Sequence, residues 1–347
     1  MSRAAGFSTS DYDYRLPPER IARYPAGRRD QSRLLHLQRL SGALNHLCFS
    51  DLAGLIPPGD ALVLNQTRVF PARLSGRKKT GGAAEVLLLR RLGEREWLAL
   101  VRPGKRVPEG TVIEVAEALS VEVVGVERDG GRRVVLHSDL EQEEALERYG
   151  TVPLPPYLGR EPDERDRERY QTVYARETGS VAAPTAGLHL TPEMLLRLER
   201  RGVRVLRLVL HVGAATFRPV ESEDPAAHRM PAEWYRVPDE AAAGLNQLRR
   251  EGGACWAVGT TVARALETVA SADGFIRAGE GWTDLFIRPP YRFRAVQRLI
   301  TNFHLPRSTL LMLVAAFAGY APTMRAYREA VAGGYRFYSY GDAMLVT

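Results

Sequence analysis

Short hydrophobic runs, separated by glycine, proline and charged residues, characterise the chain between residues 68 and 135. Closely spaced runs without an intervening helical repeat predict short β-strands packed as a small barrel or sandwich. These runs are AEVLLLR (84–90), EWLALV (96–101), TVIEV (111–115), LSVEVVGVE (119–127) and RRVVLH (132–137). We therefore expect an all-β, barrel-like unit in this part of the chain.

Helical and strand-like patterns alternate on either side of the β-rich stretch. Thr191 predicts a helix cap, with Pro192 at the first helical position. The predicted helices span residues 11–24, 141–150, 191–202, 238–253 and 262–270, and the predicted strands lie within 60–65, 203–212 and 254–261. Repeated β/α units place functional loops at the carboxyl ends of their strands.

The order of these patterns predicts an α/β fold with an insertion. We expect a discontinuous α/β main domain, barrel-like and with a mixed sheet, from residues 1–67 and 153–347. A small all-β, barrel-like domain is inserted at 68–152. The 347 residues suffice for two cores, and 45% hydrophobic with 26% charged residues is typical of a globular protein.

The net charge of +7 and a pI near 9.5 suit a polyanionic partner, because clustered cations displace counterions from phosphates. Cys48 and Cys255 belong to no paired motif, so we expect neither a disulfide nor a thiolate metal site. The N-terminus has no signal-peptide pattern, and the apolar stretch from Leu310 is too short to span a bilayer. A cytoplasmic protein fits these features.

Two histidines lie where an α/β enzyme gathers its catalytic groups. His189 belongs to AAPTAGLHL (182–190), in which Gly187 lets the backbone approach a ligand and Thr185 adds a hydroxyl. His211 stands at the end of a predicted strand, in HVGAATFRPV. Histidine titrates near neutral pH and can act as acid or base. The alternatives are a capped turn around His189 and a buried core histidine at 211.

Two further segments join a strand to a helix. In AVGTTVARALE (257–267), free N–H groups after Gly259 and the helix dipole form a natural anion site; alternatively, Thr260 and Thr261 only cap the helix. In residues 299–319, polar side chains precede an almost wholly apolar helix, which must be buried and so holds them rigidly. We favour a functional role for this polar group, which comprises Asn302, His304, Arg307, Ser308 and Thr309.

Residues 288–298 interleave basic and aromatic side chains. Such a segment can stack on bases and hold phosphates, although a solvated arginine face explains it equally well. The residues concerned are Arg288, Tyr291, Arg292, Phe293 and Arg294.

Motifs of several common enzyme classes do not occur in the sequence. No two histidines have i, i+3 or i, i+4 spacing and no acidic cluster has metal-loop spacing, so we expect no metal site. The sequence has no GxxxxGK[ST], GxSxG or GxGxxG motif, which argues against the common NTPases, hydrolases and dinucleotide-binding enzymes.

Taken together, the segments resemble the S-adenosylmethionine:tRNA ribosyltransferase-isomerases of the queuosine pathway, from residue 11 to near the C-terminus. The matching motifs, in the family's order, are LVLNQTRVFPARLSGRK, PLPPYL, RYQTVYA, VAAPTAGLHL, LHVGAATFRPV, HRMPAEWY, GTTVARALE, TNFHLPRSTLLMLV and YSYGDAML. The sequence departs from the family pattern at Gln66, where aspartate is common, and at Leu190 and Pro290. We assign no acid/base role to Gln66.

The resemblance implies a pentosyl-transferring enzyme that uses S-adenosylmethionine as co-substrate and has no prosthetic group. It moves and isomerises the ribosyl group onto 7-aminomethyl-7-deazaguanine at the wobble position of tRNA, giving epoxyqueuosine-tRNA, adenine and methionine. The reaction begins with loss of a C5′ proton next to the sulfonium, so it needs a base and an acid.

The resemblance also suggests roles for individual residues. As acid and base we expect members of the set His189, His211 and His304. Substrate-binding candidates are Thr185, Gly187, Thr260, Thr261, Arg264, Asn302, Arg307, Ser308, Tyr340 and Asp342. A positive groove for tRNA is expected between the inserted domain, carrying Arg73, Arg77, Lys78 and Lys79, and the segment with Arg288, Tyr291, Arg292, Phe293 and Arg294.

Two other functions remain open from the sequence. An S-adenosylmethionine-dependent tRNA methyltransferase would share both substrates, although the usual glycine-rich loop is missing. A non-catalytic tRNA-binding protein built on the β domain would leave the polar clusters around His189 and His304 unexplained. The sequence shows no coiled coil, so we expect a monomer.

Overall fold

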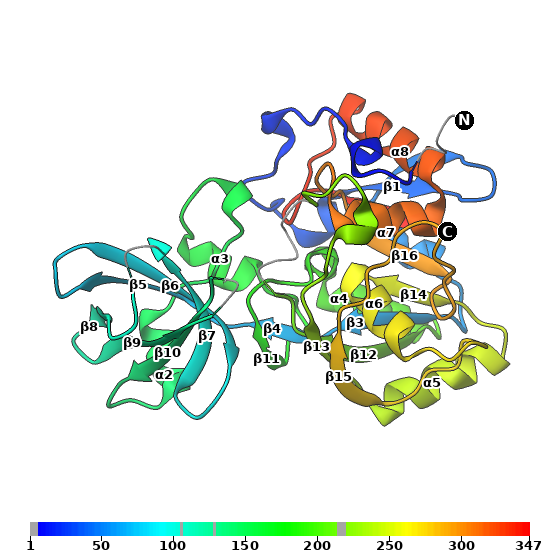
Figure 1. Cartoon of the computed structure of the whole chain (residues 1–347). Helices are drawn as coiled ribbons and strands as arrows, with labels where there is room; N and C mark the ends of the chain where they lie inside the picture. The colour runs from blue at the N-terminus through cyan, green and yellow to red at the C-terminus, as the bar shows by residue number, and fades with distance from the viewer. Residues whose placement is uncertain (1–5, 105–106, 128–129, 214–219) are drawn as a thin grey trace.

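The computed structural model describes residues 6–104, 107–127, 130–213 and 220–347. Within these ranges the main strands form a nine-stranded sheet, a closed six-stranded barrel and a two-stranded sheet. The barrel lies at one end of the molecule and the large sheet with its helices at the other, with β4 (Thr67–Val69) and β11 (Glu177–Ser180) between them (Figure 1). The predicted fold class is confirmed, while the domain boundaries stay a prediction.

The main sheet is mixed and follows the order β15, β13, β12, β3, β14, β16, β17, β1, β2. Four neighbours, β12, β3, β14 and β16, run parallel to one another, whereas β17 is antiparallel to β16 and parallel to β1. The sheet thus joins strands from both ends of the chain. Its strands are β1 (Arg33–Leu37), β2 (Leu44–Cys48), β3 (Ala61–Asn65), β12 (Arg204–Leu210), β13 (Glu233–Val237), β14 (Cys255–Val258), β15 (Gly279–Thr283), β16 (Arg298–Asn302) and β17 (Ala343–Val346).

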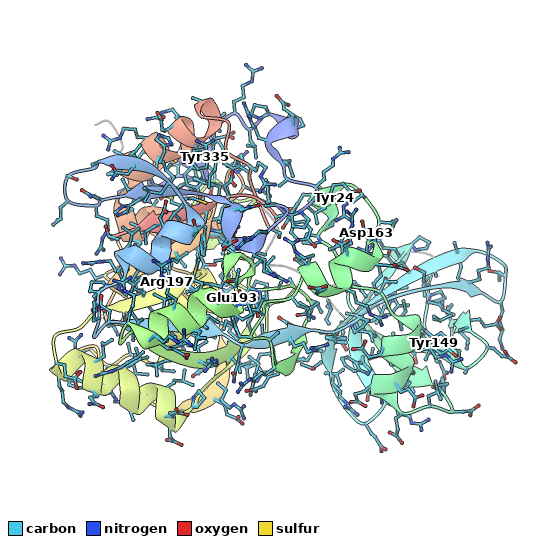
Figure 2. The ribbon with its side chains drawn as sticks, turned by 180° about the vertical axis from the view of Figure 1, so that it is seen from behind. Tyr24, Tyr149, Asp163, Glu193, Arg197 and Tyr335 are labelled. Carbon is cyan, nitrogen blue, oxygen red and sulfur yellow. The ribbon has the colours of Figure 1, made fainter. Side chains whose placement is uncertain are left out.

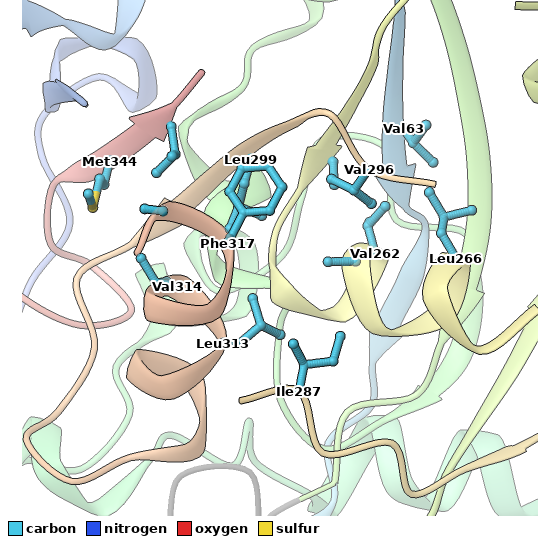
Figure 3. Packing of buried hydrophobic residues seen from close by; sticks show 14 of the residues in the cluster. Val63, Val262, Leu266, Ile287, Val296, Leu299, Leu313, Val314, Phe317 and Met344 are labelled. Atoms are coloured by element: carbon cyan, nitrogen blue, oxygen red, sulfur yellow. The ribbon is translucent and has the colours of Figure 1, made fainter. Parts of the chain in front are cut away.

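Helices cover both faces of this sheet. Successive side chains of a strand point to opposite faces. In β3, Val63 belongs to the hydrophobic cluster that includes side chains of α5, α6, α7 and α8, while Leu64 belongs to the cluster that includes side chains of α1 and α4. Figure 3 shows the first cluster, where Val262 of α6 and Phe317 of α7 meet the sheet. The α-helices of the described chain are α1 (Leu52–Leu55), α2 (Gln142–Tyr149), α3 (Glu164–Arg169), α4 (Pro192–Arg200), α5 (Asp239–Arg250), α6 (Thr260–Val269), α7 (Thr309–Ala318) and α8 (Tyr320–Ala332), of which α2 packs in the core of the barrel.

Helix α4 begins as the sequence predicts. The side chain of Thr191 accepts a hydrogen bond from the backbone N–H of Met194 at 3.2 Å, and Pro192 occupies the first helical position, where no N–H is required. Glu193 and Arg197 lie on the exposed face of the helix (Figure 2), while Met194, Leu195 and Leu198 face the sheet. The alternation of exposed and buried positions explains how α4 is held against one face.

The inserted barrel is closed by six antiparallel strands. They are β5 (Arg73–Lys78), β6 (Ala83–Arg91), β7 (Glu96–Arg102), β8 (Val112–Ala116), β9 (Leu119–Val126) and β10 (Arg132–His137). All but β5 match the predicted runs. In β5, Ser75 and Gly76 interrupt the hydrophobic alternation, and a Cβ on Gly76 would lie 2.4 Å from the carbonyl oxygen of Glu114. The close packing of β5 against β8 therefore requires Gly76, and this glycine is also the reason why the sequence pattern does not predict a strand here.

The helix predicted over residues 11–24 is wrong. The structure has two short 3-10 turns there, Thr9–Tyr12 and Pro18–Arg20, joined by extended chain. Pro17 and Pro18 explain the difference, because proline lacks a backbone N–H and excludes the preceding residue from the helical region. The apolar spacing instead lets Tyr12 reach the core.

The apolar helix predicted from Leu310 is α7, and most of its side chains are buried. No single helix in the described part of the chain is long and apolar enough to cross a membrane. Taken together, helices α7 and α8 have the length and composition of a membrane-spanning segment, and they are bent by 118° relative to each other.

Candidate active site

The carboxyl ends of β3, β12, β14 and β16 meet at one edge of the main sheet, where the sequence predicts functional loops. Asn65 ends β3 and links this edge: its Nδ2 donates to the carbonyl oxygen of Leu210 at 2.8 Å and to Thr261 Oγ1 at 3.3 Å. Its Oδ1 accepts from the backbone N–H of Thr67 at 3.1 Å. The sequence pattern predicts no role for Asn65, although it is the one polar residue at the end of an apolar strand.

A small pocket opens beside this edge. Four predicted residues line it together, namely Thr185, Asn302, His304 and Ser308. The remaining lining comes from residues for which the sequence predicts no function: Tyr157, Phe303, Leu305, Leu310, Tyr338 and Ser339. The pocket leaves room for little more than a water-sized group, and none of its lining residues is Asp, Glu, Lys or Arg.

His189 lies behind this pocket and is held on both ring nitrogens. Its Nδ1 lies 2.9 Å from Ser32 Oγ and its Nε2 lies 3.1 Å from Asn302 Nδ2. The ring also packs on Phe49, with 4.9 Å between centroids. Burial lowers the pKa of His189 to about 3, with the positive charges of Arg336 and Arg29 contributing. The imidazole is therefore neutral at pH 7.

His304 is also buried and neutral. Its Nε2 lies 2.8 Å from Thr301 Oγ1, and burial lowers its pKa to about 3. Ser308 caps α7, because its Oγ accepts from the N–H of Leu311 at 3.2 Å. Ser308 is thus occupied as a helix cap, and a substrate contact by this residue stays a prediction.

Arg307 has a φ of 58°, a backbone conformation that few residues other than glycine adopt. Its Nε is buried and has no hydrogen-bond partner in the described part of the chain. Residues 214–219 of the predicted motif HVGAATFRPV lie outside the described residues, whereas Val220 donates its N–H to the carbonyl oxygen of Arg307 at 3.0 Å. Strained backbone of this kind clusters at functional sites.

His211 belongs to a second cluster, around β4 and β11. Its Nδ1 lies 2.8 Å from Thr67 Oγ1, and its ring stacks on Trp234 with 4.9 Å between centroids. Burial lowers the pKa of His211 to about 4, although the nearby Glu177 carboxylate opposes this effect. The residue is half-buried, and its Nε2 has no hydrogen-bond partner among the described residues. A Cβ on Gly179 would lie 2.4 Å from this Nε2.

One continuous segment connects the two clusters. It runs from Gly179 in β11 through Ser180 to the 3-10 turn Thr185–His189. Ser180 Oγ accepts from the N–H of Val212 at 2.7 Å, which ties the segment to the chain just after His211. The segment that carries Thr185, Gly187 and His189 is therefore hydrogen-bonded to the residue that follows His211.

Gly187 allows close packing within this turn. A Cβ at this position would lie 2.0 Å from the hydroxyl oxygen of Tyr174, so any side chain would displace the tyrosine. The hydroxyl of Tyr174 is buried and has no hydrogen-bond partner in the described ranges. Packing accounts for the glycine, and a contact between Gly187 and substrate stays a prediction.

Arg264 forms an ion pair with Glu233 deep in the protein, where their side chains are 2% and 4% exposed. The guanidinium also donates to the carbonyl oxygens of Leu285 at 3.0 Å and Thr283 at 3.4 Å. Its donors are thus engaged within the protein. Thr260 and Thr261 open α6 and are buried at the sheet edge.

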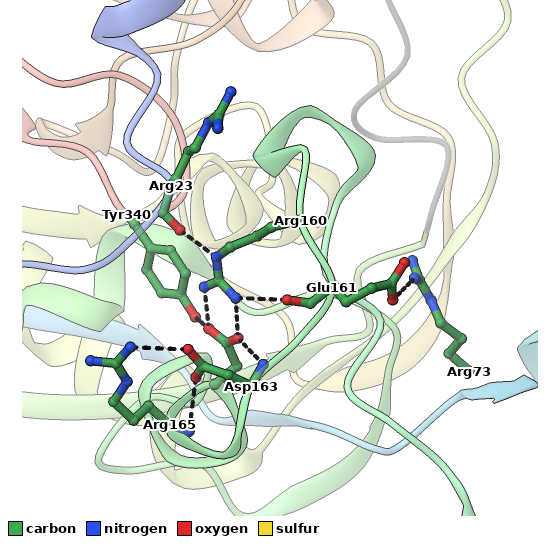
Figure 4. A network of polar contacts seen from close by, with 8 residues as sticks. Arg23, Arg73, Arg160, Glu161, Asp163, Arg165 and Tyr340 are labelled. Atoms are coloured by element: carbon green, nitrogen blue, oxygen red, sulfur yellow. Dashed lines mark hydrogen bonds and ion pairs between the residues drawn. The ribbon is translucent and has the colours of Figure 1, made fainter.

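Tyr340 and Asp342 are bonded within the protein and do not line the pocket. The Tyr340 hydroxyl donates to Asp166 Oδ1 at 2.7 Å, and Arg160 binds both oxygens of Asp166 at 2.6 and 2.7 Å (Figure 4). Asp342 accepts from the backbone N–H of Arg33 at 3.0 Å. These contacts fix the C-terminal turn against α3 and β1.

The residues predicted to bind tRNA fall into two separate groups. In β5, Arg73 is paired with Glu85 and Glu161 at 3.6 and 3.5 Å, which reduces its effective charge. The β5–β6 turn presents Arg77 and Lys79 as exposed side chains, with Lys78 half-buried beside them. Strands β5 and β6 lie at the opposite end of the molecule from β16, which the second group directly precedes (Figure 1).

The aromatic rings of the second group pack inward. Tyr291 and Phe293 contact each other edge to face at 5.2 Å between centroids, and Phe293 packs on Phe317 of α7 at 4.8 Å. Arg292 and Arg294 are exposed, and Arg288 is half-buried. The arginine side chains of this segment thus face solvent, while its aromatic rings pack against the protein. Binding of tRNA here stays a prediction.

Among the described residues, no group of three or more His, Cys, Asp or Glu side chains is placed to hold a metal ion. Cys48 and Cys255 are free thiols.

Comparison with known proteins identifies the family. Residues 9–346 match the family model described as queuosine biosynthesis protein. An S-adenosylmethionine:tRNA ribosyltransferase-isomerase from Symbiobacterium thermophilum is 58% identical over 97% of this chain and 99% of its own, and one from Syntrophomonas wolfei is 52% identical over 98% and 97%. The crystal structure of S-adenosylmethionine tRNA ribosyltransferase from Thermotoga maritima matches with a TM-score of 0.56 and 40% identity, over 97% of this chain and 99% of that one. The chain therefore belongs to the queuosine biosynthesis protein family.

Proposed function

We propose that this protein is an S-adenosylmethionine:tRNA ribosyltransferase-isomerase. The observation that carries the proposal is the match of nearly the whole chain, residues 9–346, to the family, together with relatives of that name at 58% and 52% identity. Its substrates are S-adenosylmethionine and a tRNA carrying 7-aminomethyl-7-deazaguanine at the wobble position. The products are epoxyqueuosine-tRNA, adenine and methionine, and the enzyme acts in the cytoplasm as a monomer without a prosthetic group.

Within this reaction, we assign the C5′ proton to His211. The sulfonium acidifies the C–H bond next to it, so a neutral imidazole with an unshared electron pair suffices as the base. Of the three predicted histidines, His189 and His304 are buried, and the Nε2 of His189 is already engaged by Asn302. His211 is half-buried, neutral at pH 7, and its Nε2 has no partner among the described residues.

The Thr67 hydroxyl supports this role for His211. Thr67 Oγ1 lies 3.5 Å from the carbonyl oxygen of Glu177, to which it can donate its proton. It then accepts from the Nδ1–H of His211 at 2.8 Å, which leaves the electron pair on Nε2. The stacked Trp234 ring keeps the imidazole plane in place.

The function is tested by incubating the protein with S-adenosylmethionine and tRNA bearing 7-aminomethyl-7-deazaguanine, followed by mass spectrometry of the small molecules and the nucleosides. Release of adenine and methionine with an epoxycyclopentane-bearing nucleoside is the expected result. S-Adenosylhomocysteine would instead identify a methyltransferase, and tRNA binding without turnover a non-catalytic binding protein.

The role of His211 is tested with His211→Ala and S-adenosylmethionine deuterated at C5′. We expect kcat to fall about 10²- to 10⁴-fold, as for loss of a general base, with affinity for S-adenosylmethionine retained. An unchanged kcat would exclude His211 as the base.

A further inference from the structure

The orientation of the Asn302 carboxamide is fixed by its neighbours. Its Nδ2 lies 3.1 Å from the carbonyl oxygen of Tyr338 and 3.1 Å from His189 Nε2. Exchanging Oδ1 and Nδ2 would place two acceptors, Oδ1 and the carbonyl oxygen, against each other without a proton between them. The NH₂ group must therefore face Tyr338, and both of its protons are used.

The same contacts fix the tautomer of His189. Because Nε2 accepts from Asn302, the ring proton sits on Nδ1 and is donated to Ser32 Oγ at 2.9 Å. The Ser32 hydroxyl in turn donates to the carbonyl oxygen of Arg29 at 3.3 Å. The donated hydrogen bonds therefore run in one direction, from the amide of Asn302 through His189 and Ser32 to the carbonyl oxygen of Arg29.

Asn302 Oδ1 stands at the start of this series of hydrogen bonds and, like the Tyr338 hydroxyl, lacks a partner among the described residues. It is buried and makes no hydrogen bond in the described part of the protein, and Asn302 is 2% exposed. The residue lines the pocket described above. A buried acceptor without a donor costs free energy, and such atoms in native proteins commonly belong to binding sites. Tyr338, on the same pocket, has a strained φ of 75°.

The pocket defines the group that can satisfy this acceptor. With both amide protons used, Asn302 can only accept, so the ligand must donate an N–H or O–H. Apart from His304, which is neutral, the lining has no acidic or basic side chain. An ammonium group is therefore disfavoured in this pocket, because a buried charge needs a partner of opposite charge. The narrow space admits an amino or hydroxyl group but not a ring. The rings of Tyr157 and Tyr338, with 4.1 Å between centroids, offer a flat apolar wall beside it.

We propose that Asn302 Oδ1 accepts a hydrogen bond from the exocyclic amino group of the adenine of S-adenosylmethionine, and that Ser32 and His189 position the amide for this contact. The inference rests on the proposed function and deepens it. Asn302 is then a specificity-determining residue, while His189 acts through Asn302 as a positioning residue. The amino group of adenine is uncharged, donates N–H bonds and stands at the edge of a flat ring.

The test compares equilibrium binding of S-adenosylmethionine with that of an analogue in which purine, lacking the 6-amino group, replaces adenine. Calorimetry is run on the free protein and on its complex with tRNA carrying unmodified guanine at the wobble position, which lacks the reactive aminomethyl group. The wild-type protein should bind the analogue about 5- to 150-fold more weakly, since leaving a buried acceptor unsatisfied costs about 1–3 kcal/mol.

Three variants separate the contact from general packing. Asn302→Ala removes the acceptor, so the affinity ratio should fall close to one. Ser32→Ala keeps the acceptor but loosens its support, and should give an intermediate ratio; it decides the matter if Asn302→Ala does not fold. Asn246→Ala is the control. Asn246 lies on α5, and both polar atoms of its side-chain amide are hydrogen-bonded to the backbone of Ile276, so this variant should keep the wild-type ratio.

The outcomes are distinct. Equal wild-type affinity for the two nucleosides, or a wild-type ratio in Asn302→Ala, would overturn the assignment of the amino group. A second analogue lacks a ribose hydroxyl and keeps the 6-amino group. If Asn302→Ala changes the relative affinity only for this analogue, a ribose hydroxyl donates to Oδ1, and the assignment of the amino group is overturned. Folded wild-type protein that binds neither nucleoside, alone or with tRNA, would contradict the proposed function itself.

Discussion

Replacing Gly179 by alanine should displace His211 and also strain the backbone of β11, because Gly179 has a φ of 157°. A Cβ on Gly179 would lie 2.4, 2.6 and 2.8 Å from Nε2, Cε1 and Cδ2 of the imidazole. Ordinary contact begins near 3.4 Å, so the ring or the strand must move by about 1 Å. Misplacing a reacting group by that distance can lower the rate about 100-fold. We therefore expect kcat of Gly179→Ala to fall about 100-fold, with the dissociation constant of S-adenosylmethionine nearly unchanged.

The assay is steady-state formation of adenine with both substrates saturating, combined with calorimetric binding of S-adenosylmethionine. Gly54→Ala in α1 is the matched control, because nothing lies within 4 Å of a Cβ at that position. Its kcat should equal that of the wild type. A wild-type kcat in Gly179→Ala, with a crystal structure showing the imidazole in its original place, would refute the steric argument. Full activity with a displaced imidazole would refute the role of His211.

Three further predictions concern stability and tRNA binding. The pKa values of His189 and His304 in the folded protein are both about 3, below the ordinary value of 6.5. The unfolded state therefore binds protons first, and the free energy of unfolding falls as the pH drops from about 6.5 toward 3. At pH 5 each histidine should lower the free energy of unfolding by about 2 kcal/mol, which is measured by comparing urea unfolding at pH 7.5 and pH 5. Glu233→Gln leaves a buried guanidinium uncompensated and should lower the unfolding free energy by about 3–5 kcal/mol, measured by chemical denaturation; a change below 1 kcal/mol would contradict it. Neutralising Lys78 and Lys79 should weaken tRNA binding and reduce the salt-dependence slope by about 0.7–0.9 for each phosphate that the protein no longer neutralises, and unchanged affinity would remove the barrel from the tRNA surface.

Local patterns sufficed for most elements of the fold. The barrel strands and α4 follow from alternation, caps and turns, because these signals act within a few residues. The errors arose where one residue type has two uses. Gly76 is typical of a turn in sequence, but in the structure it permits close packing of two strands. The spacing of apolar residues around Tyr12 is typical of a helix, but Pro17 and Pro18 prevent a helix from forming. Sequence pattern is therefore a poor guide where backbone geometry overrides it.

The candidate site was harder to predict, because partners far away in the chain decide what each polar side chain does. Arg264 looked free to bind an anion at a helix start, yet Glu233, on a strand across the sheet edge, occupies it. Ser308 is a predicted substrate contact, and the structure shows that it also caps α7. Tyr340 is a predicted substrate-binding residue, and in the structure its hydroxyl donates to Asp166 of α3. Residue type and local spacing therefore predict candidate residues, but they do not distinguish side chains that support a site from side chains that contact substrate.

The three histidines show why this distinction matters for chemistry. His189 is bonded to Ser32, 157 positions away, and to Asn302, 113 positions away, whereas Thr67, which holds His211, is 144 positions away. None of these pairings leaves a local signal, but each decides where the ring proton sits and which nitrogen can react. A buried histidine bonded at both nitrogens can orient a neighbour but cannot accept a proton without losing a bond. A half-buried histidine bonded at one nitrogen can do so. The proposed division of labour, with specificity at Asn302 and proton transfer at His211, thus rests on which ring nitrogen the fold leaves without a hydrogen bond.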